Sequence, residues 1–316
     1  MTGETFLSGF PYSRVAVTGG TGRLGRYVVR HLAPVCDVAV IDIEAGGDGA
    51  ILCDVRDIGA VRGVLQGCQA VVHLAALDDG IVEEEEAYID VNLRGTWNVL
   101  QASEELGISR VVLASSVAAL GIDADNPPCV LPLPVETELL PRQAYGMTKK
   151  VAEEFARAFV DRGHLEVICL RPSLVAQPDI TWSMAQTASE ADGTDPPPHA
   201  SGVNWRILRE PLAITRAFVS PDDAARAFRA ALAARGIRCG SFYVTGPDTC
   251  SALETAQAIE RSCGHRPAIA DAELYHRHPR ASAFDLRPGR EILGWQPEDC
   301  WADHLARVIA AAGTSS

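Results

Sequence analysis

The stretch Val15-Ala16-Val17-Thr18-Gly19-Gly20-Thr21-Gly22-Arg23-Leu24-Gly25 near the start of the chain decides the fold. A short apolar run, expected to be a strand, leads into three glycines spaced G-x-x-G-x-x-G, and residues 24–32 then have the apolar spacing of a helix. A strand, a glycine loop and a helix in this order can bind the pyrophosphate of a dinucleotide, because the backbone approaches the phosphates and the helix N-terminus attracts their charge. A glycine-rich turn that binds nothing is the alternative.

The first half of the chain continues this alternation of strand and helix. Apolar runs occur at residues 38–41, 51–53, 70–74, 110–114 and 167–170, and helical patterns occur at residues 85–106 and 144–161. Continuous apolar strands of about five residues, separated by helices, are typical of a parallel sheet that helices cover on both faces. We therefore expect a doubly wound α/β (Rossmann) domain over residues 1–176.

The second half of the chain is less regular. Residues 177–204 carry prolines and small polar residues, including Pro196-Pro197-Pro198, and predict a loop. Beyond this loop we predict a helix at 221–235 with Ser220 as its N-cap, a strand at 241–245 and a helix at 253–263. We expect residues 217–246 to return to the first domain, and residues 177–216 and 247–316 to form a smaller substrate-binding α/β portion.

The amino-acid composition limits the kinds of binding partner and indicates a cellular compartment. The 316 residues carry 28 basic and 41 acidic side chains, and a net charge of −13 argues against nucleic acid or an anionic membrane as the main partner. Nine scattered cysteines without a C-x-x-C pair predict reduced thiols in a cytoplasmic protein and no structural zinc. Residues 1–12 lack the pattern of a signal peptide, and no apolar run is long enough for a membrane span. The acidic run Glu83-Glu84-Glu85-Glu86 predicts a solvated helix start, where the helix dipole favours carboxylates.

Asp42 stands at the end of the second predicted strand. A carboxylate in this place accepts hydrogen bonds from the adenosine ribose hydroxyls and repels a 2′-phosphate, so it predicts NAD and makes NADP less favoured. Arg23 and Arg26 lie close enough in the sequence to weaken this preference. An ordinary loop aspartate is the alternative.

A second group of residues has the chemistry of proton transfer. Ser115-Ser116 follows the fifth strand, and Tyr145-Gly146-Met147-Thr148-Lys149 puts a phenol and an ammonium on one helix face. A free phenol has a pKa of about 10, and a nearby ammonium together with a positive nicotinamide ring would lower it. We expect Tyr145 to transfer the proton, Lys149 to tune it and Ser116 to hold the substrate oxygen. Taken alone, the tyrosine and lysine would be an exposed helix pair.

As a set, these motifs resemble the extended short-chain dehydrogenases/reductases of the NAD-dependent epimerase/dehydratase family. The resemblance extends to Asp54-Val55, His73-Leu74-Ala75-Ala76, Asn92, Arg171-Pro172-Ser173, the run from Arg216 to Ala225, and Leu293-Gly294-Trp295-Gln296-Pro297. It implies that NAD contacts Gly19, Gly22, Arg23, Leu24, Gly25, Asp42, Asp54, Val55, Leu74, Ala75, Ala76, Asn92, Tyr145, Lys149, Pro172 and Ser173. It also implies a supporting or proton-relay role for Asn92, and a homodimer that pairs the helices beginning near residues 85 and 144. A lone His73 without partner ligands is structural, and no metal is implied.

The chain departs from the family pattern in places that bear on the substrate. Ala119-Leu120-Gly121 stands where many nucleotide-sugar enzymes have Val-Tyr-Gly, and Ser116 is not followed by the acidic residues of the dehydratases, so dehydration is not expected. Arg216 follows Pro172 by 44 residues, a short span that favours a small polyol, uronate or aldonate. Arg216, with Arg277 or Arg280, is either a clamp for a diphosphate or a surface arginine.

We therefore predict an NAD-dependent oxidoreductase that transfers a hydride between the nicotinamide and a carbinol or ketone carbon of a sugar or sugar-derived small molecule. One alternative is a nucleotide-sugar epimerase that retains its NAD. The other is a cofactor-binding regulator without catalysis.

Overall fold

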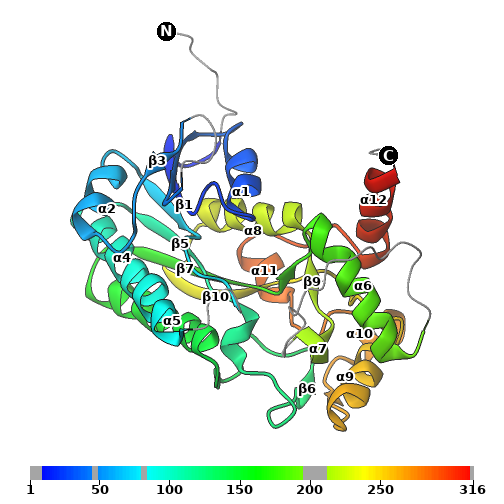
Figure 1. Ribbon diagram of the computed structural model, residues 1–316. Helices are drawn as coiled ribbons and strands as arrows, with labels where there is room; N and C mark the ends of the chain where they lie inside the picture. Colours follow the sequence, from blue (N-terminus) through cyan, green and yellow to red (C-terminus); the bar gives the residue numbers. More distant parts are fainter. Residues whose placement is uncertain (1–8, 45–48, 80–83, 195–211, 314–316) are drawn as a thin grey trace.

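The computed structural model describes residues 9–44, 49–79, 84–194 and 212–313. A seven-stranded parallel sheet with the order β10-β7-β5-β4-β1-β2-β3 forms its centre (Figure 1). The strands are β1 (Arg14–Thr18), β2 (Asp37–Asp42), β3 (Ile51–Leu52), β4 (Ala70–His73), β5 (Arg110–Ala114), β7 (Glu166–Pro172) and β10 (Cys239–Val244). The order changes direction between β1 and β4, where open α/β sheets bind their ligands. The predicted doubly wound parallel sheet is confirmed.

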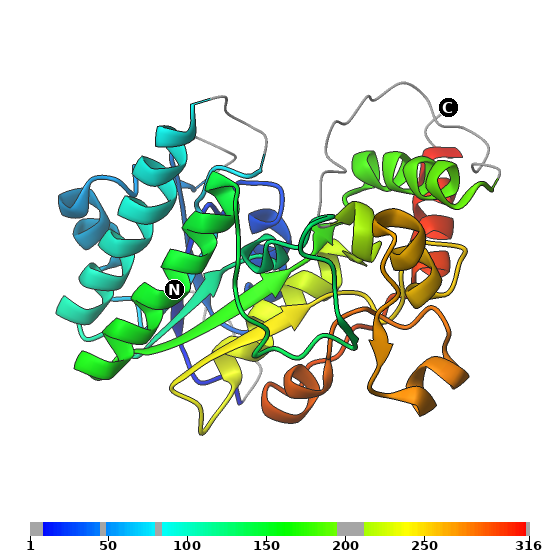
Figure 2. The ribbon, with the colours of Figure 1, turned by 90° about the horizontal axis from the view of Figure 1, so that it is seen from below.

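Helices cover both faces of this sheet, because successive strand residues point to opposite sides. Val15 and Val17 pack with α1 (Gly25–Leu32) and α8 (Pro221–Ala233). Ala16 faces the other side, where α2 (Ile58–Leu65), α4 (Gly95–Glu105) and α5 (Ala144–Arg162) form a second layer, seen in Figure 2. A strand that is buried on both faces must be apolar throughout, which is why the sheet could be predicted from short apolar runs.

The helix predicted at residues 85–106 is interrupted. The structure has α3 (Glu85–Tyr88), a π-helical segment η1 (Ile89–Arg94) and then α4. Glu84 directly precedes α3 as expected, and Glu83 lies outside the described residues. The side chain of Asn92, within η1, is buried and bonds to a neighbouring loop. Wider turns of this kind occur mostly at functional sites, and sequence periodicity does not reveal them.

The prediction of a loop over residues 177–204 is wrong for its first part, which forms α6 (Pro178–Asp192). Pro178 occupies the first helical position, where proline is compatible with a helix. Ile180, Met184 and Ala188 are spaced by four residues and bury one helix face, and Gly193 ends the helix. Residues 195–204 of the expected loop, with its three prolines, lie outside the described residues.

Smaller elements gather beside the carboxyl edge of the sheet (Figure 2). They are β6 (Val130–Leu131), β8 (Leu174–Val175), α7 (Leu212–Thr215), β9 (Phe218–Val219), α9 (Thr255–Cys263), β11 (Ala268–Ile269), α10 (Ala272–Arg277), α11 (Arg287–Ile292) and α12 (Trp301–Gly313). The two-residue strands pair as β8 with β9 and as β6 with β11, and they are too short for a sequence pattern.

The chain reaches this group from the sheet and then returns. It leaves after β7, passes through β8, α6, α7 and β9, and comes back with α8 and β10. The predicted N-cap of α8 is confirmed, since Ser220 Oγ accepts the backbone N–H of Asp223 at 3.1 Å. Among the described residues, no helix is long and apolar enough to cross a membrane.

Candidate active site

The glycine loop joins β1 to α1 at the carboxyl edge of the sheet. Gly19 has a positive φ of 70°, and a Cβ there would lie 2.7 Å from the backbone nitrogen of Ala75. A Cβ at Gly25 would lie 2.0 Å from the carbonyl oxygen of Gly19. These two positions therefore require glycine for the close approach of the loop to its neighbours. No side chain caps the start of α1, although the N–H groups of Arg26 and Tyr27 donate to the carbonyl oxygens of Gly22 and Leu24. An anion here would be attracted by the helix dipole and by the N–H groups that precede these two.

Asp42, at the end of β2, faces the same loop. Its carboxylate accepts the backbone N–H of Thr21 at 3.0 Å and that of Ile43 at 2.8 Å. An ionised carboxylate offers about four acceptor sites, so two remain for hydroxyl groups. Arg23 forms an ion pair of 2.6 Å with Asp179 of α6. Arg26 donates a hydrogen bond to the Arg23 carbonyl oxygen at 3.4 Å. The two arginines that weaken the preference for NAD thus bind other groups.

The other residues expected at the adenine and ribose end also follow strands. Asp54, after β3, is bound by the guanidinium of Arg56, which lowers the pKa of the Asp54 carboxyl. The side chain of Val55 lies in the core against Gly95. Leu74, Ala75 and Ala76 follow β4 and are half-buried, and a Cβ at Gly19 would meet the backbone of the first two.

A directed chain of hydrogen bonds runs through the buried His73 beside this loop. Thr96 Oγ1 donates to the carbonyl oxygen of Asn92 at 2.6 Å, so it must accept from His73 Nε2 at 3.2 Å. His73 Nδ1 then accepts from Thr18 Oγ1 at 2.7 Å, and Thr18 Oγ1 accepts the N–H of Ala75 at 3.4 Å. Burial, and to a lesser extent the charge of Lys149, lowers the pKa of His73 to about 3. The histidine is therefore neutral, and its ring joins the ends of β1 and β4 to the segment that carries Asn92.

The three residues expected to move a proton meet at the end of β5. Ser116 precedes a short 3-10 helix, η2 (Val117–Leu120), and its Oγ accepts the N–H of Ala118 at 3.1 Å. Lys149 is buried, its Nζ donates to the Ala114 carbonyl at 2.9 Å, and it lies 5.4 Å from the ring centre of Tyr145. The Ser116 hydroxyl is near enough to Tyr145 to lower the pKa of its phenol.

Burial and a nearby carboxylate dominate the electrostatics of this group in the chain without cofactor. Burial raises the pKa of Tyr145 well above its usual value of 10.0, the charge of Asp78 adds to this, and the Ser116 hydroxyl acts in the opposite direction. Burial lowers the pKa of Lys149 to about 8. The expected lowering of the Tyr145 pKa includes the positive ring of a bound nicotinamide, so it stays a prediction for the complex with the cofactor. Without the cofactor, burial and the nearby carboxylates set the direction of the shift, and the positive ring of a bound nicotinamide would act against them.

Asp78 is a residue that the sequence did not single out. The amide of Asn92 holds the backbone of the preceding Leu77 by two hydrogen bonds, of 2.8 and 3.0 Å. Tyr88 Oη donates to the Asp78 carbonyl at 3.1 Å, and the Tyr88 ring packs edge-on against Tyr145 at 6.1 Å. These contacts fix the loop that brings the Asp78 carboxylate to Tyr145. An aspartate in a loop has no spacing that would have revealed it.

A second missed group is the Glu153 cluster, which we define as Ser115, Glu153, Arg171 and Ser241. The Glu153 carboxylate accepts from Ser115 Oγ at 2.5 Å, from Ser241 Oγ at 2.8 Å, and from Arg171 Nε and Nη2 at 2.9 and 2.7 Å. Arg171 Nη1 also donates to the Val135 carbonyl at 2.8 Å. Burial would raise the pKa of Glu153, but Arg171 and the two hydroxyls outweigh it, so the pKa is lowered. The spacing of four residues from Lys149 was the available signal.

The remaining predicted positions, Ser173 and Arg216, follow β7 and precede β9. Ser173, after Pro172, has a buried Oγ without a hydrogen-bond partner among the described residues. Arg216 is also buried, with a positive φ of 53°. Its Nη2 donates to Ser262 Oγ at 3.1 Å, while its Nε has no partner in the described part of the chain. Arg216 is therefore not a surface arginine.

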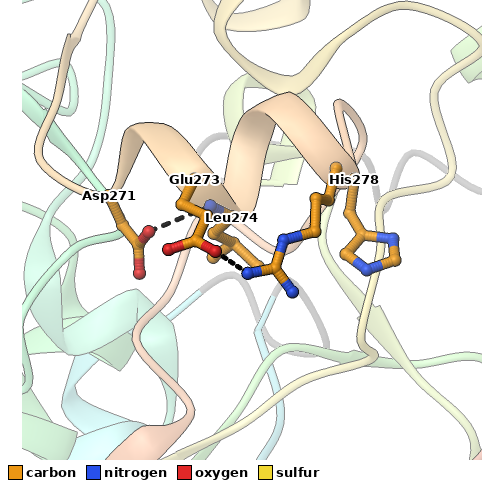
Figure 3. A pocket seen from close by; sticks show the side chains of 5 residues that line it. Asp271, Glu273, Leu274 and His278 are labelled. Carbon is orange, nitrogen blue, oxygen red and sulfur yellow. Dashed lines mark hydrogen bonds and ion pairs between the residues drawn. The ribbon is translucent and has the colours of Figure 1, made fainter.

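The two arginines considered alongside Arg216 behave differently. Arg277 is exposed and pairs with Glu273 on the same helix, within a shallow pocket that α10 and its flanking residues form (Figure 3). Arg280 donates to the Ser251 carbonyl at 3.3 Å and lies 3.8 Å from the Asp248 carboxylate. The side chains of Arg277 and Arg280 are thus exposed, whereas that of Arg216 is buried.

Known proteins with similar sequences place the chain in a family. Residues 15–246 match the sequence model of the NAD dependent epimerase/dehydratase family. The chain is 32% identical over 177 residues to the 3 beta-hydroxysteroid dehydrogenase/Delta 5-->4-isomerase of Vaccinia virus (strain Ankara), covering 50% of this chain and 51% of that protein. It is 34% identical over 168 residues to the L-arabinose 1-dehydrogenase (NAD(P)(+)) of Haloferax volcanii, covering 50% of this chain and 66% of that protein. The match thus spans about half to two thirds of the length of these relatives.

One solved structure is similar over nearly the whole chain. It is MoeE5 in complex with UDP-glucuronic acid and NAD, with a TM-score of 0.69 and 23% identity, covering 96% of this chain and 100% of that one. At this identity the similarity shows the fold.

Proposed function

The chain belongs to the NAD dependent epimerase/dehydratase family, and on this premise we propose that it is an NAD-dependent oxidoreductase. It would act at a carbinol or ketone carbon of a sugar or sugar-derived small molecule. The observation that carries the proposal is the meeting of Ser116, Tyr145 and Lys149 at the end of β5, on the sheet edge that also holds the glycine loop. The similarity to an L-arabinose dehydrogenase supports a sugar as the substrate.

The residues present fit NAD. The uncapped start of α1 suits the pyrophosphate, and the two free acceptor sites of Asp42 suit the hydroxyls of an unphosphorylated ribose. The buried Ser173 Oγ, which lacks a partner among the described residues, suits a polar group at the nicotinamide end. When bound, NAD supplies the acceptor or donor of the hydride.

In the oxidation direction, Tyr145 Oη accepts the proton of the substrate hydroxyl while the C–H bond breaks and its electron pair leaves as hydride. The C–O bond becomes a carbonyl, so atoms and charge balance. Ser116 Oγ donates a hydrogen bond that orients the substrate oxygen, and the ammonium of Lys149 stabilises the phenolate. In the reverse direction Tyr145 donates the proton. Asn92 supports the site by holding the loop that carries Asp78.

We further propose that residues 177–216 and 247–316 bind the substrate and that residues 1–176 and 217–246 bind the cofactor. The second candidate function is an epimerase of a nucleotide sugar, which oxidises and reduces one carbon while keeping its NAD. A buried guanidinium with an unpaired Nε suits a diphosphate, and Arg216 is the observation that favours this candidate.

A homodimer is also part of the proposal, with α4 and α5 at the interface. Trp97 on α4 and Met147 on α5 are large apolar side chains that are 39% and 42% exposed, and a partner helix pair would cover them. We place the protein in the cytoplasm, because its nine cysteines are free thiols. Light scattering at micromolar concentration tests the dimer, and a monomer would remove it.

The experiment that tests the function is a substrate screen with NAD present. Ligands that bind raise the apparent stability, so a thermal-shift screen of pentoses, hexoses, sugar acids and nucleotide sugars selects the candidates. Net formation of NADH, followed by its absorbance, supports the dehydrogenase. Conversion of a nucleotide sugar without NADH, by protein that retains NAD on purification, supports the epimerase.

Substitution of the tyrosine supplies the decisive control. Tyr145→Phe removes the proton acceptor, so turnover should be lost while NAD binding remains. Tyr12→Phe, before β1 at the opposite edge of the sheet, should keep full activity. Unchanged turnover in Tyr145→Phe would overturn the mechanism.

A further inference from the structure

We propose that Glu153 is a positioning residue, which fixes α5 against the end of β5 and so places Tyr145 and Lys149 against Ser116. The inference rests on the proposed function for its catalytic consequence, but its structural part can be tested separately.

The contact between β5 and α5 has a regular form. Three consecutive residues at the strand end contact three residues of the helix that are one turn apart. The Ala114 carbonyl accepts from Lys149 Nζ at 2.9 Å, Ser115 Oγ donates to Glu153 Oε1 at 2.5 Å, and the Ser116 hydroxyl is near enough to Tyr145 to affect the pKa of its phenol. Since Tyr145, Lys149 and Glu153 are spaced by four, they share one helix face. Of these three contacts, the hydrogen bond between Ser115 and Glu153 involves no residue to which we assign a part in proton transfer.

The Glu153 cluster ties this helix to three strands at once. Through Ser115 it binds β5, through Arg171 it binds β7, and through Ser241 it binds β10. Both oxygens of the carboxylate are used, and the side chains of Glu153 and Arg171 are each 6% exposed. A buried carboxylate with four directed bonds allows few alternative placements of the helix that carries it.

Apolar packing alone would not fix the helix in this way. Ala156, Phe159 and Val160 pack the rest of α5 on the sheet, and such contacts have no preferred direction. A displacement of about 1 Å at a reacting group can cost on the order of 100-fold in rate. A buried ion pair often adds little to the free energy of unfolding. We therefore assign the Glu153–Arg171 pair the role of specifying one position of α5 on the sheet.

The chain offers a matched control at the opposite edge of the same strands. The first residues of β5 and β7, Arg110 and Glu166, form an ion pair through Arg110 Nη2, and Arg110 Nε donates to Glu166 Oε2 at 3.1 Å. Arg110 is buried. Loss of this pair should lower stability without displacing Tyr145, which lies at the other end of the strands.

The first measurement compares Glu153→Gln with Glu166→Gln. Glu153→Gln should lower kcat by about 10- to 100-fold, while the Kd for NAD stays within about twofold of the wild type, a change of less than half a kcal/mol. Glu166→Gln should lower the Tm while kcat stays within about twofold. Equal losses of kcat in the two variants at matched Tm would overturn the proposal.

A double variant separates folding from positioning. Replacing a buried ion pair by apolar residues of similar volume is often neutral or stabilising. Glu153→Leu with Arg171→Met should therefore have a higher Tm than Glu153→Gln without regaining the wild-type kcat. The double variant has neither the bonds from Ser115 and Ser241 to the carboxylate nor the bond from Arg171 to Val135. Recovery of both would mean that the cluster has only a structural role.

Hydrogen exchange gives a readout that needs no turnover. The amides of residues 145–150 should exchange faster in Glu153→Gln than in the wild type, and at the wild-type rate in Glu166→Gln. Unchanged exchange at these residues in Glu153→Gln would overturn the positioning role. If the wild type converts no substrate with NAD, the proposed function fails and the exchange data alone decide this inference.

Discussion

The carboxylate of Asp42 and the backbone N–H of Thr21 are joined by a hydrogen bond of 3.0 Å between the end of β2 and the glycine loop. Asp42 therefore acts twice in the proposed cofactor site. It fixes the loop that would receive the pyrophosphate, and its remaining acceptor sites would accept hydrogen bonds from the ribose hydroxyls. Loop geometry and cofactor preference are thus linked through one side chain.

Asp42→Asn should relax the preference for NAD over NADP. The amide keeps an acceptor for Thr21 but loses the charge that repels a 2′-phosphate. We expect the ratio of kcat/KM for NAD to that for NADP to fall at least about tenfold, or 1.4 kcal/mol. Asp37→Asn, at the exposed start of the same strand, is the control and should leave the ratio unchanged. An unaltered ratio in Asp42→Asn would remove Asp42 as the selector.

Asp78→Asn should shift the pH dependence of alcohol oxidation. The Asp78 charge raises the pKa of Tyr145, so its removal lowers that pKa and makes the phenolate available at lower pH. The rising limb of kcat against pH should therefore move to lower pH. Asp125→Asn, in an exposed loop, is the matched control. A rising limb that stays in place or moves to higher pH would contradict the assignment.

The neutral His73 predicts a loss of stability in acid. Its pKa is about 3 in the folded protein against an ordinary value of 6.5, so between these values the unfolded chain binds more protons than the folded one. The free energy of unfolding should then fall as the pH drops below 6.5, by up to about 1.4 kcal/mol per pH unit from this residue. His73→Gln should have lower stability at neutral pH but a shallower decline between pH 6.5 and 5, measured by urea unfolding. His265→Gln, on the surface, should decline as the wild type does.

Gly25→Ala should abolish NAD binding. The added Cβ would lie 2.0 Å from the Gly19 carbonyl oxygen, so either the loop or the start of α1 must move. Gly63→Ala, in α2 with nothing within 4 Å of the new Cβ, should instead raise stability by about 0.5–1 kcal/mol. Titration of each variant with NAD and thermal unfolding separate the two effects. Normal NAD affinity in Gly25→Ala would show that the loop is not the pyrophosphate site.

The sequence predicted what depends on local pattern. Apolar runs predicted the sheet, and the glycine spacing predicted a loop in which Gly19 and Gly25 have no room for a Cβ. The spacing of Tyr145 and Lys149 placed both on one helix face, which the structure brings to the end of β5. Such features are set within a few residues, so a single segment suffices to reveal them.

Contacts between distant segments were not predicted. Asp78 reaches Tyr145 because Asn92 and Tyr88 hold its loop, and no spacing records that arrangement. In the sequence, Glu153 resembles a surface residue on a charged helix. In the structure it is buried and forms an ion pair with Arg171 of β7. Prolines suggested a loop where Pro178 in fact begins a helix. The first two features depend on tertiary contacts, whereas α6 has a local signal, the apolar spacing of Ile180, Met184 and Ala188, that the prolines outweighed in the prediction.

The late return of the chain to its sheet sets an order for folding during synthesis. When residues 1–176 have left the ribosome, β7 is still an edge strand and the face bearing Val15 and Val17 still lacks α8. That face is covered, and β10 closes the edge, only after Val244 has been made. A nascent chain halted before this point exposes an apolar layer and an unpaired strand edge, which are the surfaces that chaperones bind and that lead to aggregation. The proposed cofactor-binding part therefore completes its sheet only after the chain has been translated through residues 177–216 of its neighbour.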